Sequence, residues 1–509
     1  MKRALLTICL AITILLTACS TPSITTGSTG TMGTTGTTAS NCVHTDHNDD
    51  GNCDSCQGSV LVELDFYTIN DLHGKLADGD NHIGVDELTT YIKNAQATEN
   101  AIVLSAGDMW QGSSESNMTQ GLIMTDWMNQ VGFAAMALGN HEYDWGEDAI
   151  LKNDALAQFP FLAINVYDRE TNSRVSYCDA STVVDIAGVQ VGIIGAMGDC
   201  YSSISSDKTT GIYFVTGSAL TKLVKEESDR LRQEAGVDFI VYVIHDGYGS
   251  GTSSSLSGSH MSGYYDISLS DGYVDLVFEG HTHQKYAVAD EYGVYHLQHR
   301  GDNSGGISHA EIRINSVTGT WTLTQADLVP TSTYASLDDD PMIQQLLEKY
   351  DELISPANRV VGTNRRYRNS DELCDLVAQL YYELGRSEWG DQYLITLGGG
   401  FLSCRSPYSL PAGEVLYSDL QSIFPFDNDI VLCSVKGADL LSKFINTSND
   451  RYHIFGSWGQ IDPNATYYVV VDSYTASYAP NRLTVVAQYT PGIYARDLLA
   501  DYITGGGYA

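Results

Sequence analysis

The sequence predicts an α/β protein with two folded domains. Short runs of β-branched and other apolar residues alternate with stretches that carry apolar residues at helical spacing, which is the pattern of layered α/β domains. The pattern occurs on both sides of a polar stretch, residues 331–357, that is expected to contain a linker helix. With 509 residues, 43% of them hydrophobic, the chain can form two or three domains with sizeable cores.

The first 40 residues are expected to direct and tether the protein. Lys2 and Arg3 precede an apolar run that is too short to span a membrane and that ends in small residues before Cys19. This resembles a bacterial lipoprotein signal, so residues 1–19 are predicted to be a signal peptide with Cys19 lipidated. An ordinary secretory signal is the alternative, and both predict export. Residues 20–40 are almost entirely Thr, Gly and Ser, which predicts a flexible tether to a membrane of the cell envelope.

Residues 41–58 form a separate segment that is rich in Cys and Asp and has three equally open interpretations. A calcium loop would use oxygen ligands at alternate positions, although the twelfth position holds Gln57 in place of Glu. A small zinc site would use sulfur and imidazole ligands. A solvated spacer with one disulfide is the third interpretation. The residues concerned are Asp46, Asn48, Asp50 and Gly51 for calcium, and Cys42, His44, Cys53 and Cys56 for zinc.

Four predicted strands of the first domain end in polar clusters with metal-binding side chains. These strands are residues 64–69, followed by Asp71 and His73; residues 101–105, followed by Asp108; residues 239–244, followed by His245; and residues 274–278, followed by His281 and His283. A glycine turn at residues 137–146 adds Asn140, His141, Glu142 and Asp144. Because ligands just past the carboxyl ends of strands meet in the crevice of an open sheet, we expect these side chains to form one site.

The other predicted elements complete the α/β pattern. Helices are expected at residues 85–96, 121–131 and 219–235, and a second strand set at residues 183–186, 189–194, 294–297 and 310–314 is expected to form the other sheet. Residues 248–263 are rich in Gly and Ser, which is typical of a lid or substrate-facing loop. In the second domain, strands are expected near residues 393–397, 430–435 and 467–471, and helices near residues 371–384 and 438–445.

The ligand types and the net charge restrict the chemistry. A mixture of carboxylate, imidazole and amide oxygen suits zinc, manganese, cobalt or iron better than calcium. Two such ions about 4 Å apart can clamp a phosphoryl group and lower the pKa of a bridging water. The formal charge of -36 and the lack of a polybasic stretch argue against binding of a nucleic-acid polymer. A small phosphate substrate would therefore need local cations, and metals supply them.

Five motifs resemble the signature of the calcineurin-like metallophosphoesterases. They are Asp71-Leu72-His73, Gly107-Asp108, Gly139-Asn140-His141-Glu142, His245 and Gly280-His281-Thr282-His283, in this order. Residues 140–146 and the large carboxyl-terminal region further resemble the bacterial 5'-nucleotidase and UDP-sugar hydrolase family. The resemblance implies a four-layer αββα domain over residues 60–330, followed by a smaller α/β 5'-nucleotidase carboxyl-terminal domain over residues 358–509.

The resemblance also implies roles for residues of the first domain. Two divalent metal ions would be held, one by Asp71, His73, Asp108 and His283, with Asp108 bridging, and the other by Asn140, His245 and His281. His141 would act as a catalytic electrostatic group beside the phosphate, oriented by Asp144. We interpret Glu142 as a carboxylate that orients a ligand histidine.

In the second domain the resemblance implies substrate contacts. Residues 397–401 resemble the family's substrate-binding glycine turn, which would place Gly399 and Gly400 against the ligand. Leu397 and Leu402 stand where the family usually has Asn and Arg, so Arg405 is the candidate replacement for that guanidinium. Arg365 and Arg368 fall where the family has another substrate arginine. Phe426 resembles one ring of the family's aromatic clamp, and Tyr478 is the candidate for the second ring.

The function expected from the sequence is that of an exported, lipid-anchored two-metal 5'-nucleotidase that releases phosphate from nucleoside 5'-monophosphates. A UDP-sugar hydrolase or a 2',3'-cyclic-nucleotide phosphodiesterase with the same metals is the alternative. A surface binding protein with an inactive phosphatase fold is less favoured, because the ligand set is complete.

Overall fold

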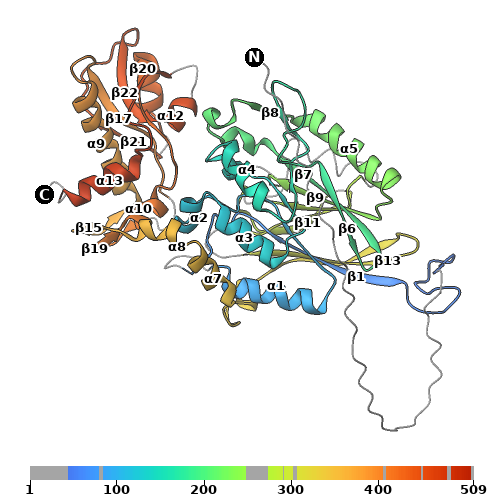
Figure 1. Cartoon of the computed structure of the whole chain (residues 1–509). Helices are drawn as coiled ribbons and strands as arrows, with labels where there is room; N and C mark the ends of the chain where they lie inside the picture. The colour runs from blue at the N-terminus through green and yellow to red at the C-terminus, as the bar shows by residue number, and fades with distance from the viewer. Residues whose placement is uncertain are drawn as a thin grey trace, which may run out of the picture.

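The computed structural model describes residues 44–78, 84–247, 273–290, 292–301, 306–404, 409–448, 451–478 and 483–505. These residues form a large amino-terminal α/β domain and a smaller carboxyl-terminal α/β domain beside it (Figure 1). The lipoprotein signal, the tether and the predicted lid at residues 248–263 lie outside the described residues. No helix in the described ranges combines the length and apolar character that crossing a membrane requires.

Two six-stranded sheets form the centre of the first domain. The first has the order β14-β13-β1-β2-β3-β4, and the second has the order β11-β12-β10-β9-β7-β6. The strands of the first sheet are β1 (Leu61–Ile69), β2 (Ala101–Ser105), β3 (Ala135–Ala137), β4 (Phe161–Leu162), β13 (Ile307–Asn315) and β14 (Trp321–Val329). Those of the second are β6 (Ser181–Ile186), β7 (Val189–Met197), β9 (Phe239–His245), β10 (Leu276–Glu279), β11 (Tyr286–Ala289) and β12 (Tyr295–Gln298). A separate two-stranded pair joins β5 (Val166–Asp168) to β8 (Ile212–Phe214).

Helices cover the outer face of each sheet (Figure 1). Helices α1 (Asp86–Thr98) and α3 (Leu122–Val131) bury Leu88 and Trp127 in one apolar cluster with Tyr67 of the first sheet. Helix α5 (Gly217–Glu234) packs its apolar face on the second sheet. The two sheets face each other across a third cluster that includes Phe66 and Phe239, whose rings stack at 5.6 Å. The predicted four-layer αββα architecture is confirmed.

The division of strands between the two sheets differs from the prediction. Strand β13, expected in the other sheet, pairs antiparallel with β1 in the first sheet over nine residue pairs, from Leu61 with Asn315 to Ile69 with Ile307. Strands β9 and β10 pair parallel with each other, and β9 also pairs parallel with β7, so both belong to the second sheet. Pairing between segments far apart in the chain decides which sheet a strand joins, and the periodicity of the sequence alone does not reveal that pairing.

The second domain is built on one five-stranded sheet with the order β21-β17-β22-β20-β23. Its strands are β17 (Ile395–Phe401), β20 (Ile430–Lys436), β21 (Tyr452–Gly456), β22 (Thr466–Asp472) and β23 (Leu483–Gln488). Its main helices are α9 (Ser370–Trp389), α10 (Tyr417–Ile423), α12 (Ser473–Tyr478) and α13 (Ala495–Thr504). Helix α9 starts where Asn369 accepts a hydrogen bond from the Glu372 amide at 2.9 Å, a capping arrangement typical of helix starts.

The expected glycine turn at residues 397–401 is wrong, because strand β17 continues through it. Gly399 and Gly400 are buried and pair with Ile454 and His453 of β21. A Cβ atom at Gly399 would lie 2.1 Å from the His453 carbonyl oxygen, and one at Gly400 would lie 2.6 Å from Thr475 Oγ1. The glycines therefore allow close packing around the strand, and Phe401 and Leu402 after them reach the cavity described below.

Two short helices, in place of one, lie in the region that was predicted to link the domains. Helix α7 (Pro341–Lys349) starts at Asp340, whose side chain accepts from the Met342 amide, and α8 (Asp351–Ile354) follows. Helix α10 of the second domain also meets α2 (Ser114–Thr119) of the first, where Ser114 Oγ donates to Gln421 Oε1 at 2.9 Å. The two domains are thus in direct contact beside the polar strand ends.

Candidate metal centre

The predicted metal-binding side chains come together where the carboxyl ends of both sheets meet. Asp71 and His73 follow β1, Asp108 follows β2, and Asn140 begins the 3-10 turn η1 (Asn140–Tyr143) after β3. From the second sheet, His245 ends β9, and His281 and His283 follow β10. The site therefore lies between two packed sheets and takes residues from each.

Left-handed backbone turns aim these side chains inward. Five of the seven predicted ligands have positive φ angles: Asp71 (53°), His73 (50°), Asp108 (56°), His281 (70°) and His283 (51°). This conformation is uncommon for residues other than glycine and gathers at functional sites, where the surrounding structure holds it in place. Gly139 permits the close approach of the turn at Asp108, because a Cβ there would lie 2.3 Å from Asp108 Oδ1.

One group of potential ligands consists of Asp71, His73 and His283. Their donor atoms lie within 4.8 Å of one another, and Asp71 Oδ1 lies 3.4 Å from His283 Nε2. His73 Nδ1 lies 3.0 Å from the Gln111 carbonyl oxygen, so its proton sits on Nδ1 and its lone pair on Nε2. That Nε2 is 3.4 Å from His283 Nε2. A cation between these atoms would satisfy the converging lone pairs.

A second group surrounds Asp108. Asp108 Oδ2 lies 3.0 Å from His245 Nε2, while the amide of His141 donates to Asp108 Oδ1 at 2.8 Å. His245 Nδ1 donates to the Ala106 carbonyl oxygen at 2.6 Å, which leaves Nε2 as the coordinating nitrogen. The rings of His245 and His281 are 5.3 Å apart. Asp71, Asp108 and His245 also form one group of donor atoms within 4.8 Å, so Asp108 lies between the two groups.

The charges of the cluster favour cations. Burial opposes ionisation of Asp108, but His245, His141 and His73 hold its pKa well below the usual range. Burial also disfavours a charged His245, yet Asp108 and Asp71 raise its pKa to about 10. Burial, with the repulsion from His245, lowers the pKa of His281 to about 3, so this ring is a neutral nitrogen donor. Without a metal, the buried carboxylates of Asp71 and Asp108 therefore keep a proton on His245, and a metal ion bound to His245 Nε2 would take the place of that positive charge.

The donor set fits a pair of divalent metal ions. Asn140 Oδ1 is buried and has no hydrogen-bond partner within the described part of the chain. Such an unpaired carbonyl oxygen costs about 1–3 kcal/mol, which a metal ion at that position would offset. One ion would be held by Asp71, His73, Asp108 and His283. The other would be held by Asp108, Asn140, His245 and His281. These are the two ligand sets that the family resemblance implied. When bound, they would polarise the phosphoryl oxygens and lower the pKa of a water nucleophile.

Glu142 has a different role from the one predicted for it. Its carboxylate contacts backbone amides instead of a histidine ring: Oε2 accepts from Asp108 at 2.9 Å and from Gly139 at 2.7 Å. Oε1 accepts from Met109 at 2.8 Å and from Trp110 at 3.3 Å. Glu142 therefore fixes the loop that carries Asp108 to the turn that carries Asn140. A side chain that joins two loops of distant sequence cannot be assigned this role from a local motif.

His141 and Asp144 are paired as the sequence implied. His141 Nδ1 lies 2.8 Å from Asp144 Oδ2, and both side chains are largely buried. The Asp144 carboxylate fixes the orientation of the ring and stabilises positive charge on it. The His141 ring is also 5.2 Å from that of His73, so it adjoins the candidate ligands.

Phe426 of the second domain lies directly against this histidine, with ring centroids 5.8 Å apart. Both side chains line one cavity between the domains, which holds about 1130 Å³ of space including its opening to solvent. The first domain contributes Asn140, His141, Asp144, Lys208 and His281, and the second contributes Phe401, Phe426, Asp427 and Tyr474. One aromatic clamp candidate is thus at the site.

Several cavity features were missed by the sequence analysis. Tyr474 and Phe401 supply aromatic rings, and Lys208 supplies a cation. Arg496 is buried and holds the clamp segment, because its guanidinium donates to the carbonyl oxygens of Phe424 and Phe426 at 3.3 and 3.2 Å and pairs with Asp427. Their positions depend on how distant segments pack, and no local pattern marks them.

Two other predicted substrate residues, Arg365 and Arg368, are not among the side chains that line the cavity. Arg365 is exposed, and Arg368 donates to Asn364 and lies 6.0 Å from the Tyr502 ring centroid, so both are away from the cavity lining. Arg405 lies outside the described residues. Tyr478 ends α12, but its side chain is not among those described. Arg368 is thus held by neighbours within the second domain.

Comparison with known families agrees with this site. Residues 64–285, which contain every candidate metal ligand, match the family model of calcineurin-like phosphoesterases. The chain therefore contains a calcineurin-like phosphoesterase domain, which covers residues 64–285.

Relatives that align over most of the chain include UshA, 5'-nucleotidases, an endonuclease of Bacillus subtilis and an apyrase of Tabanus yao. Protein UshA of Yersinia enterocolitica is 24% identical over an alignment that covers 85% of this chain and 89% of UshA. The 5'-nucleotidase of Vibrio vulnificus is 23% identical, with 70% of this chain and 69% of that protein covered. In fold, a 5'-nucleotidase precursor from Thermus thermophilus matches with a TM-score of 0.65 at 20% identity, covering 87% of this chain and 96% of that one.

The variant Glu142→Gln is expected to weaken metal binding. The amide nitrogen of Gln would face backbone N–H groups that now donate to a carboxylate, so the Asp108 loop would lose support. We expect roughly 10- to 100-fold weaker manganese binding, the usual effect of removing a group that supports metal ligands. Equilibrium dialysis of the metal-free protein with manganese measures this, with Glu170→Gln, at an exposed turn position, as the control. Equal affinity of Glu142→Gln and the natural protein would contradict the role of Glu142.

Proposed function

We propose that this metallophosphoesterase is a 5'-nucleotidase that releases phosphate from nucleoside 5'-monophosphates. The observation that carries the proposal is the contact between Phe426 and His141 across the interdomain cavity. An aromatic ring for a base and a candidate metal site for a phosphate then lie in one cavity. A nucleoside monophosphate has these two recognition elements joined by a ribose.

The cavity residues of this chain suit such a substrate. Aromatic rings at Phe426, Phe401 and Tyr474 offer surfaces on which a base can stack. Asp427 and Asn428 offer acceptors and donors for the polar edge of a base or for ribose hydroxyls. Lys208 lines the same cavity and can attract a phosphate.

His141 and Asp144 provide the catalytic electrostatics. The hydrogen bond from Nδ1 to Asp144 orients the His141 ring so that Nε2 can donate to a phosphoryl oxygen as charge develops there. Phe426 packs on that ring and keeps water from one side of it. The likeness to UshA and to 5'-nucleotidases over most of the chain supports the same assignment.

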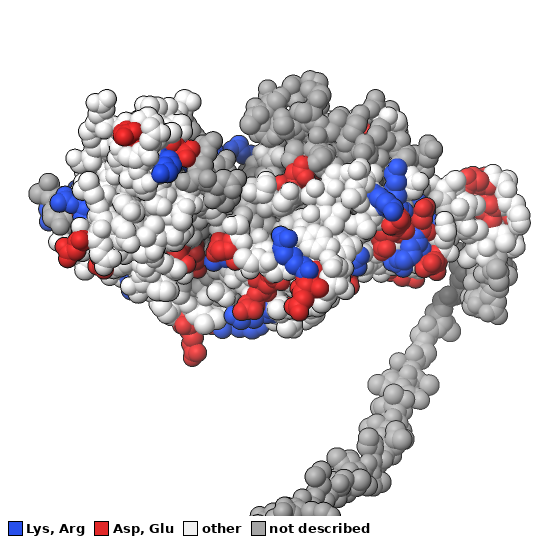
Figure 2. Space-filling model, turned by 90° about the horizontal axis from the view of Figure 1, so that it is seen from above, with Lys and Arg blue, Asp and Glu red and all other residues white. Residues whose placement is uncertain are grey.

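We further propose that the protein works outside the cytoplasm, held to a membrane by a lipid on Cys19. The support is the sequence of residues 1–40, with its signal-like start and its Thr-, Gly- and Ser-rich tether. The acidic composition and the face in Figure 2, which shows basic side chains only in small separate groups, favour a small nucleotide over a nucleic-acid polymer.

A substrate panel tests the proposed function. The full chain, loaded with manganese, zinc or cobalt, is expected to release phosphate from AMP faster than from UDP-glucose, 2',3'-cyclic AMP or an aryl phosphate. A chelator should abolish the release. Intact cells that produce the protein should also hydrolyse added AMP, which does not cross membranes, whereas Cys19→Ala cells should lose the membrane-bound fraction of this activity. If UDP-glucose or the cyclic nucleotide is the preferred substrate, the nucleotidase assignment is wrong.

Phe426→Ala is expected to raise the KM for AMP. Stacking of a base on an aromatic ring contributes about 1–3 kcal/mol, which corresponds to a roughly 10- to 100-fold higher KM. An aryl phosphate without a nucleobase should be affected much less, and comparison of the two substrates separates base stacking from damage to the metal site. Phe455→Ala is the matched control, because Phe455 is an exposed phenylalanine of the same domain outside the cavity lining. An unchanged KM for AMP would exclude Phe426 as the base-stacking ring.

A further inference from the structure

The residues before β1 form a small module, residues 44–60, at the amino end of that strand (Figure 1). The apolar clusters of the described residues include none of the side chains of this module. The Cys53 side chain is nevertheless fully buried, and the chain folds back on itself through hydrogen bonds from Cys53 to Gly58 and from Asp54 to Thr45, at 2.8 and 2.7 Å. A segment this short without an apolar core usually needs a disulfide or a metal to be stable.

The carboxylates of the module are used for contacts within the protein. Asp46 accepts hydrogen bonds from the amides of Asp50 and Gly51 and from Asn315 Nδ2 at 2.7 Å. Asp49 accepts from the hydroxyl groups of Thr318 and Thr320 at 2.8 and 2.6 Å. These bonds attach the module to the turn between β13 and β14. Among the described residues, no three carboxylates of the module form a ligand group within 4.8 Å, so the geometry does not favour calcium.

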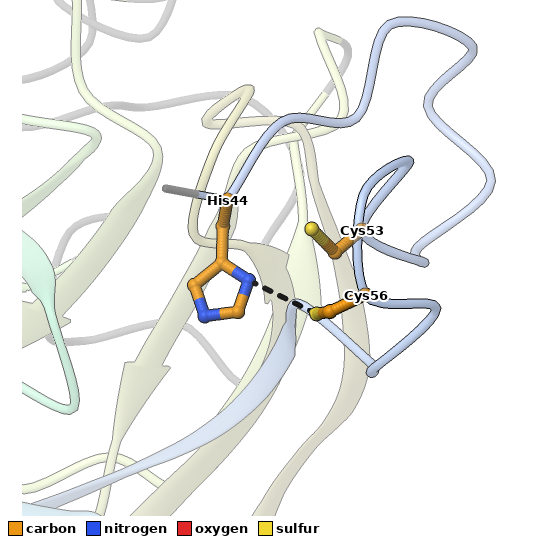
Figure 3. Close-up of side chains that lie close together, drawn as sticks. All are labelled: His44, Cys53 and Cys56. Atoms are coloured by element: carbon orange, nitrogen blue, oxygen red, sulfur yellow. Dashed lines mark hydrogen bonds between the residues drawn. The ribbon is translucent and has the colours of Figure 1, made fainter. Parts of the chain in front are cut away.

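Three other side chains of the module do converge. Donor atoms of His44, Cys53 and Cys56 lie within 4.8 Å of one another, and Cys56 Sγ is 3.7 Å from His44 Nδ1. Figure 3 shows the two sulfur atoms and the imidazole edge facing the same space. No disulfide joins Cys53 to Cys56 in the structure, so such a bond does not hold the module together.

The surroundings of Cys53 favour a thiolate. Hydrogen bonds from the backbone amides of Cys56 and Thr45 are the largest of several contributions that hold the pKa of Cys53 well below its usual range. The thiolate, not the thiol, is the form of cysteine that binds metals. Backbone donors that point at the sulfur would also stabilise its negative charge in a metal complex.

We propose that His44, Cys53 and Cys56 bind a structural zinc ion that stabilises the amino-terminal module. Two thiolates and an imidazole suit zinc far better than a hard ion such as calcium. Structural zinc has four ligands. The described residues provide three of them.

This site is separate from the candidate metal centre of the hydrolase. The module precedes the first residue of β1, and the candidate ligands Asp71 and His73 follow its last residue. The strand has nine residues, so about 30 Å separates the two sites. Loss of the structural ion should therefore leave phosphate release intact, and the zinc proposal can fail independently of the proposed function.

Metal analysis of the full chain tests the site. The natural protein and the double variant Cys53→Ser/Cys56→Ser are purified in zinc without a chelator, and zinc per chain is measured by mass spectrometry. We expect the double variant to hold one equivalent less and to retain its rate of phosphate release. Cobalt loading should give a thiolate-to-metal charge-transfer band that the double variant lacks. Amide hydrogen exchange over residues 44–60 should become faster in the variant.

Two control variants separate loss of the proposed zinc site from other effects of a substitution. Ser55→Ala changes an exposed residue between the two cysteines and should keep the full zinc content. Cys200→Ser removes the thiol that lies within 4.8 Å of donor atoms of His245 and His281, and it should keep the charge-transfer band. Equal zinc content in the natural protein and the double variant would overturn the proposal. So would a disulfide at Cys53 or Cys56 in the zinc-loaded protein, or calcium in place of zinc at this module.

Discussion

The central constraint on this structure is the concentration of lone pairs around Asp108. Its carboxylate lies 3.0 Å from His245 Nε2 and accepts from the His141 amide, and it adjoins the group formed by Asp71 and His73. Such a buried cluster is unfavourable without positive charge. The left-handed backbone turns, the glycine at residue 139 and the four amide contacts of Glu142 all hold the cluster in place. The fold thus preorganises a site for cations.

The second domain determines what this site can act on. A metal pair alone would cleave many phosphate esters, whereas the ring of Phe426 against His141 restricts the adjoining cavity. Arg496 holds that segment through three carbonyl and carboxylate contacts from the last helix, α13. Under the proposed function, packing within the second domain would set the choice of substrate, and the strand ends of the first domain would supply the chemistry.

The sequence predicted which side chains gather at the strand ends, because these side chains follow recognisable buried strands. Asp71, Asp108 and His245 each come directly after such a strand, and the parallel strands bring their ends together. The sheet assignment of β13 was wrong, because pairing with β1 depends on a register between distant segments. The turn expected at Gly399 was wrong because β21 extends the pairing of β17. Lys208 and Tyr474 were missed because only the packed domains bring them to the cavity. Arg496 was missed because its contacts with Phe424 and Phe426 join distant segments of the second domain.

The most direct test of the account is the location of bound metal. Crystals of the full chain grown with manganese can be measured near the manganese absorption edge, where anomalous scattering locates the ions. The account predicts two peaks on either side of the Asp108 carboxylate, one beside Asp71, His73 and His283 and the other beside Asn140, His245 and His281. A single peak, or none next to Asp108 at saturating manganese, would contradict it.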